Sequence, residues 1–437
     1  MKKKVALYNL GCKVNAYELE AMRQMLLDSD YEIVPFNTVA DAYIINTCTV
    51  TNVADRKSRQ MLHKAKKTNP QSVVVAVGCY AQAEGDKLVK DDAVDIIVGN
   101  NKKKELPAIL AGYFAENGEV QVVEDIGATD EYEELNISDS GEYTRAYIKV
   151  QDGCNQFCTY CIIPYMRGRV RSRKIEDVLK EVKRLAAADY KEIVLTGIHL
   201  SSYGVERGEK DGLLELIKAV HQVNDIKRIR LGSLEPGIVS ENFASEISKL
   251  EKVCPHFHLS LQSGCDETLK RMKRRYNTQE FKEKCSILRK YYDKVAITTD
   301  IIAGFPGETI EEFEETKHFV REIGFYETHI FKYSPRKGTK AAEMPAQVPE
   351  ATKSERSKTL IAIGTENKRA FVTAFLGEKL EILVEEKVKV QGQEYWSGHT
   401  KEYLKVLVRT KEDLAGKFVS VVAKDIVDEE YIYGEIS

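Results

Sequence analysis

The sequence lacks both a long hydrophobic run and a net charge of either sign. No apolar stretch approaches the roughly 18–20 residues that a membrane-spanning helix needs. Residues 1–4 lead directly into a strand-like segment, so we expect no signal peptide and no membrane anchor. The 437 residues carry 65 Lys and Arg against 68 Asp and Glu. This balance argues against a protein that coats nucleic acid by bulk charge, but it permits a local basic site.

The chain also lacks the features of a disulfide-bonded secreted protein. It has nine cysteines, an odd number, and no secretory signal. We therefore expect a cytoplasmic protein whose thiols bind metal or take part in catalysis. The length predicts about two to four domains, and a hydrophobic content of 43% is typical of a folded, globular chain. A monomer is the default expectation.

The first 115 residues alternate between strand-like and helical segments. Continuous apolar runs are typical of parallel strands that are covered on both faces. We predict an open parallel α/β sandwich for residues 1–115, followed by an acidic linker at residues 116–141. The expected strands are residues 5–10, 43–46, 72–77 and 95–98, and the expected helices are residues 16–27 and 54–67.

A second series of strands and helices occupies residues 142–371. Six repeats of this kind indicate an open, partial (β/α)6 version of the eight-fold TIM barrel. Short β-branched runs in residues 372–437 then predict a small all-β barrel. The strands of the second series are predicted at 145–151, 192–196, 227–232, 256–261, 296–302 and 328–333, with helices at 175–187, 213–223, 278–292, 310–323 and 353–371. The barrel strands are predicted at 380–384, 387–391, 403–408, 418–423 and 431–435.

Three cysteines form a compact run after the first strand of the second series. Cys154, Cys158 and Cys161 have C-x3-C-x2-C spacing, and active sites of such barrels lie at the C-terminal ends of the strands. Structural zinc takes four ligands, and no fourth Cys or His lies nearby, so the run favours an iron–sulfur cluster with one iron open to another molecule. The alternative, three inert buried thiols, is less favoured because free cysteines seldom cluster on a loop flanked by glycine.

Three further cysteines each follow a strand of the first domain. Cys12, Cys48 and Cys79 come after the first, second and third predicted strands. The carboxyl ends of parallel strands line one crevice, so these thiols are expected to converge into a second three-cysteine site. The alternative is coincidence, since cysteines are common in protein cores.

The CxxxCxxC run after the first strand of a partial barrel resembles the signature of the radical S-adenosylmethionine (SAM) superfamily. With LGCKVN, NTCTVT and GCY, the two triads together resemble the methylthiotransferases of that superfamily, over essentially the whole chain. The resemblance implies two 4Fe–4S clusters, an auxiliary one in domain 1–115 and a SAM-binding one in a core at residues 142–371. It also implies an RNA-binding TRAM barrel at residues 372–437 and a flavodoxin- or ferredoxin-like electron donor.

The family also points to residues that contact SAM. Tyr160 matches the aromatic position where the backbone approaches the adenine, although a packing role is equally open. Polar residues and glycines at later strand ends suit a ligand, because glycine lets the backbone come close and carboxylates or amides bind ribose hydroxyls. Taken singly, each is as often a turn. These positions are Thr196, Gly197, Ser233, Glu235, Gln262, Asp300 and Gly304.

The opening LGCKVNAYELE resembles the branch that acts on N6-threonylcarbamoyladenosine (t6A). This implies an enzyme that adds a methylthio group to C2 of t6A at tRNA position 37, using two SAM molecules. One alternative is the branch that modifies an aspartate of a small-subunit ribosomal protein. A second, of another class, is a non-catalytic iron–sulfur or zinc scaffold that binds RNA.

Two basic runs and the C-terminal barrel are the candidates for contact with the anticodon loop. Phosphates near the active site need neutralising, although charge runs are often solvated faces. The barrel itself is acidic, so any RNA contact there would use one face, and packing is an equally open reading for Trp396. The candidate residues are Arg167, Arg169, Arg171 and Arg173, then Lys273, Arg274 and Arg275, and in the barrel Trp396 and Lys401, with Tyr395 and His399 beside them.

Cys254, Cys265 and Cys285 belong to neither triad. We expect them to pack in the interior, as free cysteines commonly do, with a role near the site left open for Cys265 because it adjoins a strand end.

Overall fold

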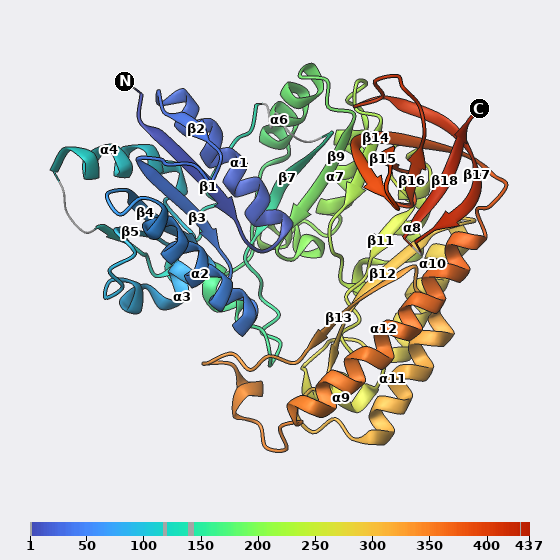
Figure 1. Cartoon of the computed structure of the whole chain (residues 1–437). Coiled ribbons are helices and arrows are strands. Elements are labelled where there is room, and N and C mark those ends of the chain that lie inside the picture. Colours follow the sequence, from blue (N-terminus) through green and yellow to red (C-terminus); the bar gives the residue numbers. More distant parts are fainter. Residues whose placement is uncertain (1, 117–119, 139–143, 429) are drawn as a thin grey trace.

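The structure is a computed structural model that describes residues 2–116, 120–138, 144–428 and 430–437. Three parts follow one another along the chain: an open α/β domain, a set of βα repeats and a closed β-barrel. Figure 1 shows the first part in blue, the repeats in green to orange, and the barrel in red beside the repeats. The predicted α/β class is confirmed.

The N-terminal domain is a parallel sheet with strand order β2-β1-β3-β4-β5-β6. Its central strands are buried along their whole length, which explains their continuous apolar sequences. The edge strand β2 is only three residues long, too short to show a pattern. The strands are β1 (Lys4–Asn9), β2 (Glu32–Val34), β3 (Ala42–Thr47), β4 (Val73–Gly78), β5 (Ile96–Val98) and β6 (Val120–Val122), and the helices are α1 (Lys13–Asp28), α2 (Asn52–Thr68), α3 (Cys79–Leu88) and α4 (Leu106–Glu116).

The segment expected to be a linker is partly structured. β6 lies inside residues 116–141 and pairs in parallel with β5, so this part of the segment completes the N-terminal sheet. The short turn η2 (Ile126–Ala128) follows it, and its Asp125 side chain accepts a hydrogen bond from the Gly127 amide. Residues 117–119 and 139–141 of the predicted linker, and residues 142–143 at the predicted start of the next domain, lie outside the described residues.

The six predicted strands of the central region are all present, and they follow one another in space. A sheet with order β10-β9-β7-β8 and a sheet with order β11-β12-β13 are joined by isolated parallel bridges such as Leu234 to Leu259. This is the open partial barrel that the repeats predict. The strands are β7 (Arg145–Asp152), β8 (Arg171–Ser172), β9 (Glu192–Gly197), β10 (Arg228–Leu231), β11 (His256–His258), β12 (Ala296–Ala303) and β13 (Glu327–Lys332).

Helices cover the outside of this barrel and pack on one large apolar core. α10 and α11 begin with capping boxes, Asn277 with Glu280 and Thr309 with Glu312, in which each side chain accepts a backbone N–H of the other residue. The helices are α5 (Ile163–Arg167), α6 (Ile175–Ala187), α7 (Gly212–His221), α8 (Glu241–Ser248), α9 (Asp266–Arg271), α10 (Thr278–Tyr291), α11 (Ile310–Ile323) and α12 (Glu350–Thr373).

The C-terminal barrel closes in the order β14-β15-β16-β18-β17. Two predicted strands, 380–384 and 387–391, form one continuous strand, β14, with a register shift between Val384 and Glu386. Gln391 and Gly392 both have positive φ, the requirement of a tight hairpin turn, and β15 follows immediately. β15 was not predicted because its sequence is largely polar. The strands are β14 (Lys379–Val390), β15 (Gln393–His399), β16 (Lys405–Val408), β17 (Phe418–Val427) and β18 (Tyr431–Ile436).

Candidate functional site

The three N-terminal cysteines converge at one edge of the sheet. Cys12 precedes α1 after β1, Cys48 follows β3, and Cys79 opens α3 after β4. These strands are neighbours, so their carboxyl ends meet. Gly11 has φ +106°, and a Cβ placed on it would lie 3.1 Å from the Cys48 Sγ. Burial raises the pKa of the Cys48 thiol to about 12, and the neighbouring thiols of Cys79 and Cys12 raise it as well.

The second triad lies on the loop after β7, at the C-terminal end of the strand. The Gln156 amide donates to the Cys154 Sγ at 3.5 Å, and Arg274 Nη1 donates to the Cys158 Sγ at 3.2 Å. Burial raises the pKa of Cys161 to about 12. A hollow of about 230 Å³ opens beside these thiols, lined by Phe157, Cys158, Thr159, Cys161, Tyr165, Lys273, Thr339 and Lys340.

Neither triad has the compact arrangement of a single-ion site. Sulfur ligands of one zinc ion lie about 2.3 Å from it and therefore within about 4 Å of one another. Among the described residues, one group of three possible metal ligands has all its ligand atoms within 4.8 Å, and it consists of His258, Asp300 and His329. Three thiols can hold three irons of a 4Fe–4S cluster and leave one iron for another ligand.

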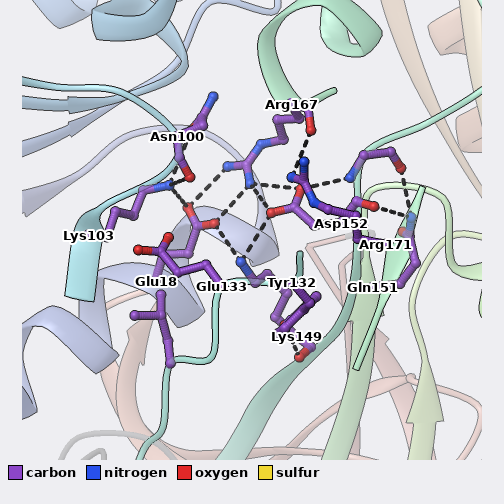
Figure 2. A network of polar contacts seen from close by, with 12 residues as sticks. Glu18, Asn100, Lys103, Tyr132, Glu133, Lys149, Gln151, Asp152, Arg167 and Arg171 are labelled. Atoms are coloured by element: carbon purple, nitrogen blue, oxygen red, sulfur yellow. Dashed lines mark hydrogen bonds and ion pairs between the residues drawn. The ribbon is translucent and has the colours of Figure 1, made fainter. Parts of the chain in front are cut away.

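A buried polar network lies between the two triads, and Figure 2 shows it. We call Glu18, Lys103, Lys149, Asp152 and Arg167 the interdomain network. Glu18 and Lys103 come from the N-terminal domain, whereas the other three come from the barrel. All five side chains are at most 5% exposed. Burial alone would raise the pKa of Glu18, but Arg167, Lys103 and Lys149 together hold it well below its usual range.

The loops that carry the N-terminal cysteines bond to the barrel domain. Asn100 Nδ2 donates to the Cys79 Sγ at 3.5 Å and to the Met166 carbonyl at 2.7 Å. Asn15, three residues after Cys12, accepts from Arg167 Nη2 at 2.8 Å.

The Cys48 loop is held by a second arginine. Arg336, 7% exposed, lies in the loop after β13, and its Nη2 lies 2.7 Å from both the Thr49 hydroxyl and the Asp55 carboxylate. Arg336 Nη1 also donates to Asn52 Oδ1 at 2.6 Å. The two triads are therefore held in a fixed relation by side chains of both domains.

The strand-end positions predicted for SAM form several groups. Glu235 accepts from Arg274 Nη2 at 2.5 and 2.7 Å, and its Oε1 lies 3.7 Å from His199 Nε2. The pKa of Glu235 is lowered, because His199 and Arg274 outweigh the effect of its burial. This places Glu235 and Arg274 beside Cys158. Arg274 was predicted as an RNA contact, with the SAM carboxylate as an alternative partner for an arginine of these runs, and its bond to a thiol was not predicted.

Other predicted SAM positions differ in accessibility. Thr196 is buried at the end of β9, and a Cβ on Gly197 would meet Gln151 Oε1 at 2.8 Å. Ser233 is exposed after β10. Gln262 has φ +70°. Tyr160 packs edge-to-face on Phe305, as its packing alternative describes.

The backbone at Gly304 requires a glycine. Its φ is +73°, and a Cβ there would lie 2.4 Å from the Lys353 Cγ of α12. Its amide donates to Glu308 Oε2 at 2.6 Å. A contact of Gly304 with SAM stays a prediction.

A group of imidazoles beside Asp300 was not predicted. Asp300 of β12 pairs in register with His329 of β13, and Asp300 Oδ2 lies 3.3 Å from His258 Nε2. The two histidine rings stack with their centroids 5.7 Å apart. Histidines at alternate strand positions carry no distinctive spacing, so only the pairing of β11, β12 and β13 reveals the group.

The first basic run is largely internal, contrary to the prediction. Arg167, Arg171 and Arg173 are at most 3% exposed. Arg167 belongs to the interdomain network, Arg171 donates to the carbonyl oxygens of Thr129 and Arg167, and Arg173 pairs with Glu134 and Glu181. Their charges are used within the protein. Arg169 alone of the four predicted is exposed, and its guanidinium lies 4.9 Å from the Phe157 ring centroid.

The second basic run is divided in the same way. The Arg274 side chain is 5% exposed and bonds Glu235, which corrects its assignment to RNA. Lys273 and Arg275 are exposed. Lys273 also lines the hollow beside Cys158 and Cys161.

Two of the predicted RNA-contact residues of the C-terminal barrel, Trp396 and His399, are buried. Trp396 is 6% exposed and donates from Nε1 to the Glu412 carbonyl at 2.9 Å, so it packs in the barrel. Lys401 Nζ donates to the Glu251 carbonyl at 2.9 Å, and the Lys401 carbonyl accepts from Arg230 at 3.0 Å. Lys401 therefore joins the barrel to the core. His399 is buried and contacts Arg145, while Tyr395 is half-buried and bonds Gln393.

The remaining three cysteines, Cys254, Cys265 and Cys285, are buried, as expected for packing residues. In the part of the chain that the structure describes, no helix is both long and apolar enough to cross a membrane.

Two family models match the chain. One, described as the Radical SAM superfamily, matches residues 148–320, and the other, described as Uncharacterized protein family UPF0004, matches residues 4–99. They fall on the two domains that carry the cysteine triads.

Curated relatives match nearly the full length. The chain is 40% identical over 432 residues to the threonylcarbamoyladenosine tRNA methylthiotransferase MtaB of Bacillus subtilis (strain 168), covering 99% of this chain and 95% of that protein. It is 34% identical over 434 residues to the tRNA-2-methylthio-N(6)-dimethylallyladenosine synthase of Moorella thermoacetica, covering 96% and 95%.

A solved structure shares the fold. The radical S-adenosylmethionine methyltransferase TsrM from Kitasatospora setae, with cobalamin and a 4Fe–4S cluster bound, matches with a TM-score of 0.55 at 17% identity, covering 77% of each chain. The two relatives, the two cysteine triads and the partial barrel all indicate the same family. The chain belongs to the radical SAM methylthiotransferase family, and it is an enzyme that uses SAM and 4Fe–4S clusters.

Proposed function

We propose that this enzyme adds a methylthio group to C2 of t6A at position 37 of tRNA, using two SAM molecules and two 4Fe–4S clusters. The observation that carries the substrate assignment is the 40% identity, over 99% of the chain, to a relative named for threonylcarbamoyladenosine tRNA. The LGCKVN sequence around Cys12 supports the same branch. The placement of two separate triads on one interdomain network supports the need for two clusters.

Each triad has its own task in this proposal. Cys154, Cys158 and Cys161 would hold the cluster that binds SAM, and Cys12, Cys48 and Cys79 the auxiliary one. When bound, the groups supply a methyl group, sulfur and a radical able to take hydrogen from an unactivated C–H bond. The protein has to hold these partners in line and keep water out. The buried interdomain network suits the first of these tasks, because it holds the two domains together.

The exposed cations beside the second triad suit the approach of an RNA loop. Arg169, Lys273 and Arg275 are exposed, and Lys273 lines the hollow at Cys158 and Cys161. Cations here would neutralise phosphates close to the reacting adenosine. We also propose a flavodoxin- or ferredoxin-like donor, since the clusters must be reduced, and a monomeric enzyme in the cytoplasm.

Mass spectrometry of tRNA nucleosides from a deletion strain tests the substrate. The proposal predicts loss of 2-methylthio-t6A with t6A retained, restored by the wild-type gene but not by a C154A variant. Unchanged 2-methylthio-t6A would contradict the proposal. Loss of a 2-methylthio-dimethylallyl nucleoside would instead assign the enzyme to the other tRNA branch, and loss of a methylthio group from a ribosomal protein would assign it to the third.

A further inference from the structure

Arg167 is a buried residue of the barrel domain whose side chain bonds residues of the N-terminal domain. It ends the short helix α5, six residues after Cys161, and it is 1% exposed. We propose that Arg167 is a positioning residue for the N-terminal cysteine triad, which it fixes against the barrel and provides with a permanent positive charge. This inference rests on the proposed function, because it assumes a cluster on Cys12, Cys48 and Cys79.

Both terminal nitrogens of the Arg167 guanidinium bond to side chains, and these side chains come from both domains. Nη1 donates to Glu18 Oε1 at 2.8 Å and lies 3.2 Å from Asp152 Oδ1. Nη2 donates to Glu18 Oε2 at 3.1 Å and to Asn15 Oδ1 at 2.8 Å. Bidentate pairs of this kind fix direction as well as distance. Glu18 and Asn15 both lie in the first two turns of α1, the helix that Cys12 precedes.

The hydrogen bonds around Arg167 extend toward both triads, and Figure 2 shows those of Glu18, Lys103 and Asp152. Asn15 donates to the Leu10 and Thr47 carbonyls at 2.7 and 3.0 Å, next to the Cys12 and Cys48 loops. Glu18 also pairs with Lys103, which donates to Asn100, the residue that bonds Cys79. On the other side, the Asp152 carboxylate accepts from the Gly153 amide at 2.8 Å, directly before Cys154.

Arg167 also places a positive charge close to the N-terminal cysteines. Its Nη2 bonds Asn15, which itself bonds Leu10, shortly before Cys12, and Thr47, directly before Cys48. The pKa of Arg167 is itself raised well above its usual value, because Cys79, Glu18 and Asp152 outweigh the effect of burial. An arginine stays charged under all ordinary conditions. Its charge is thus a constant feature of the environment of the triad.

A fixed positive charge beside an iron–sulfur cluster favours the reduced form, which carries one more negative charge. Removing it should lower the reduction potential, and removing a nearby negative charge should raise the potential. Arg167 and Glu18 therefore make opposite predictions. A loss of rigidity alone would not produce a pair of shifts of opposite sign.

The test is an EPR-monitored redox titration of the full-length chain. Cys154, Cys158 and Cys161 are changed to Ala in every sample, so that only the N-terminal cluster contributes to the signal. R167M should shift the potential to more negative values by a tenfold change in the reduction equilibrium, about 59 mV for one electron. E18Q should shift it in the positive direction. R167K keeps the charge and should stay close to the parent protein. R321M, which removes an exposed arginine of α11, is the control for a distant charge and should not shift it.

Iron content separates the possible failures. If the parent sample, with its second triad removed, holds no iron, the auxiliary cluster of the proposed function is wrong. If the variants hold a full cluster but R167M and E18Q leave the potential unchanged, or shift it in the same direction, the role of Arg167 is wrong. If R167M does not fold, the other two variants still test the role of Arg167. A positive shift of the reduction potential in E18Q, together with an unchanged potential in R167K, supports the role. Any other pair of results overturns it.

Discussion

Arg173 shows at the scale of one residue how this protein uses a buried charge. Its side chain is 1% exposed, and it pairs with Glu181 of α6 and, through Nε at 2.8 Å, with Glu134. Tyr17 of α1 donates to Glu181 at 3.3 Å and to the Leu135 carbonyl at 2.5 Å. A charge in such a place is stable only while its partners remain, so the group fixes α1 against the barrel.

Removing this arginine should be costly. R173M leaves Glu181 buried without its cation, and such losses typically cost about 3–5 kcal/mol. Chemical unfolding followed by circular dichroism should show this loss in the free energy of unfolding. R169M removes an exposed arginine four residues earlier and should stay within about 0.5 kcal/mol of wild type. Equal effects of the two variants would contradict the buried pairing.

At the scale of elements, the starts of three barrel strands dock the C-terminal β-barrel. Glu192 of β9 pairs with Arg230 of β10 at 2.9 Å. Arg230 also donates to the Lys401 carbonyl at 3.0 Å, and Arg228 donates to the His399 carbonyl at 2.8 Å. Arg145 of β7 reaches Glu385. Glu192 therefore lies next to all three of these arginines, because Arg145 and Arg228 also lie 3.9 Å from its carboxylate.

Glu192 should give the stability a measurable pH dependence. Burial alone would raise its pKa, but Arg230 and Arg145 lower it from 4.5 to about 2. Because the folded pKa is the lower one, its contribution is fully present above pH 4.5 and is lost as the pH falls toward 2. This difference corresponds to a contribution on the order of 3 kcal/mol.

Unfolding of wild type and E192Q between pH 6 and pH 2 checks this directly. The gap in stability between the two proteins should be widest above pH 5 and should narrow as the pH falls. E215Q, at a carboxylate that is 58% exposed, is the matched control and should show a small gap at all pH values. A gap for E192Q that does not change with pH would contradict the assignment of its charge.

The elements also show what the sequence can predict and where it stops. α6 and α11 begin and end as predicted, because amphipathic spacing and, in α11, a capping box mark them. The convergence of Cys12, Cys48 and Cys79 is predictable because the carboxyl ends of neighbouring parallel strands meet, and the second triad is predictable because its three cysteines share one loop. The burial of the basic runs is not predictable in the same way. Glu18, the partner of Arg167, comes from a distant segment of the chain, and the spacing of Arg173 and Glu181 does not show that both side chains are buried. β15 is missed because half its residues are polar in a small barrel.

At the scale of the whole molecule, two cysteine sites from different domains are linked to one buried network. The C-terminal β-barrel packs at the opposite, N-terminal ends of the strands of the partial barrel. In the proposed function, SAM is cleaved at the site of Cys154, Cys158 and Cys161, and sulfur is delivered from the site of Cys12, Cys48 and Cys79. The two activities should therefore be separable by mutation, because the thiols of each triad have hydrogen-bond donors of their own, the Gln156 amide at Cys154 and the Asn100 side chain at Cys79.

The most direct test is a reaction of reconstituted, reduced enzyme with SAM and tRNA that contains t6A, followed by mass spectrometry of the nucleosides and of 5′-deoxyadenosine. The account predicts 2-methylthio-t6A and 5′-deoxyadenosine from the wild type, which should hold about eight irons per chain. The variant with Cys12, Cys48 and Cys79 changed to Ala should hold about four, cleave SAM and form no methylthio product. Two results would contradict the proposed function. One is the formation of 2-methylthio-t6A by that variant, and the other is a wild-type enzyme that holds both clusters and cleaves SAM but forms no 2-methylthio-t6A.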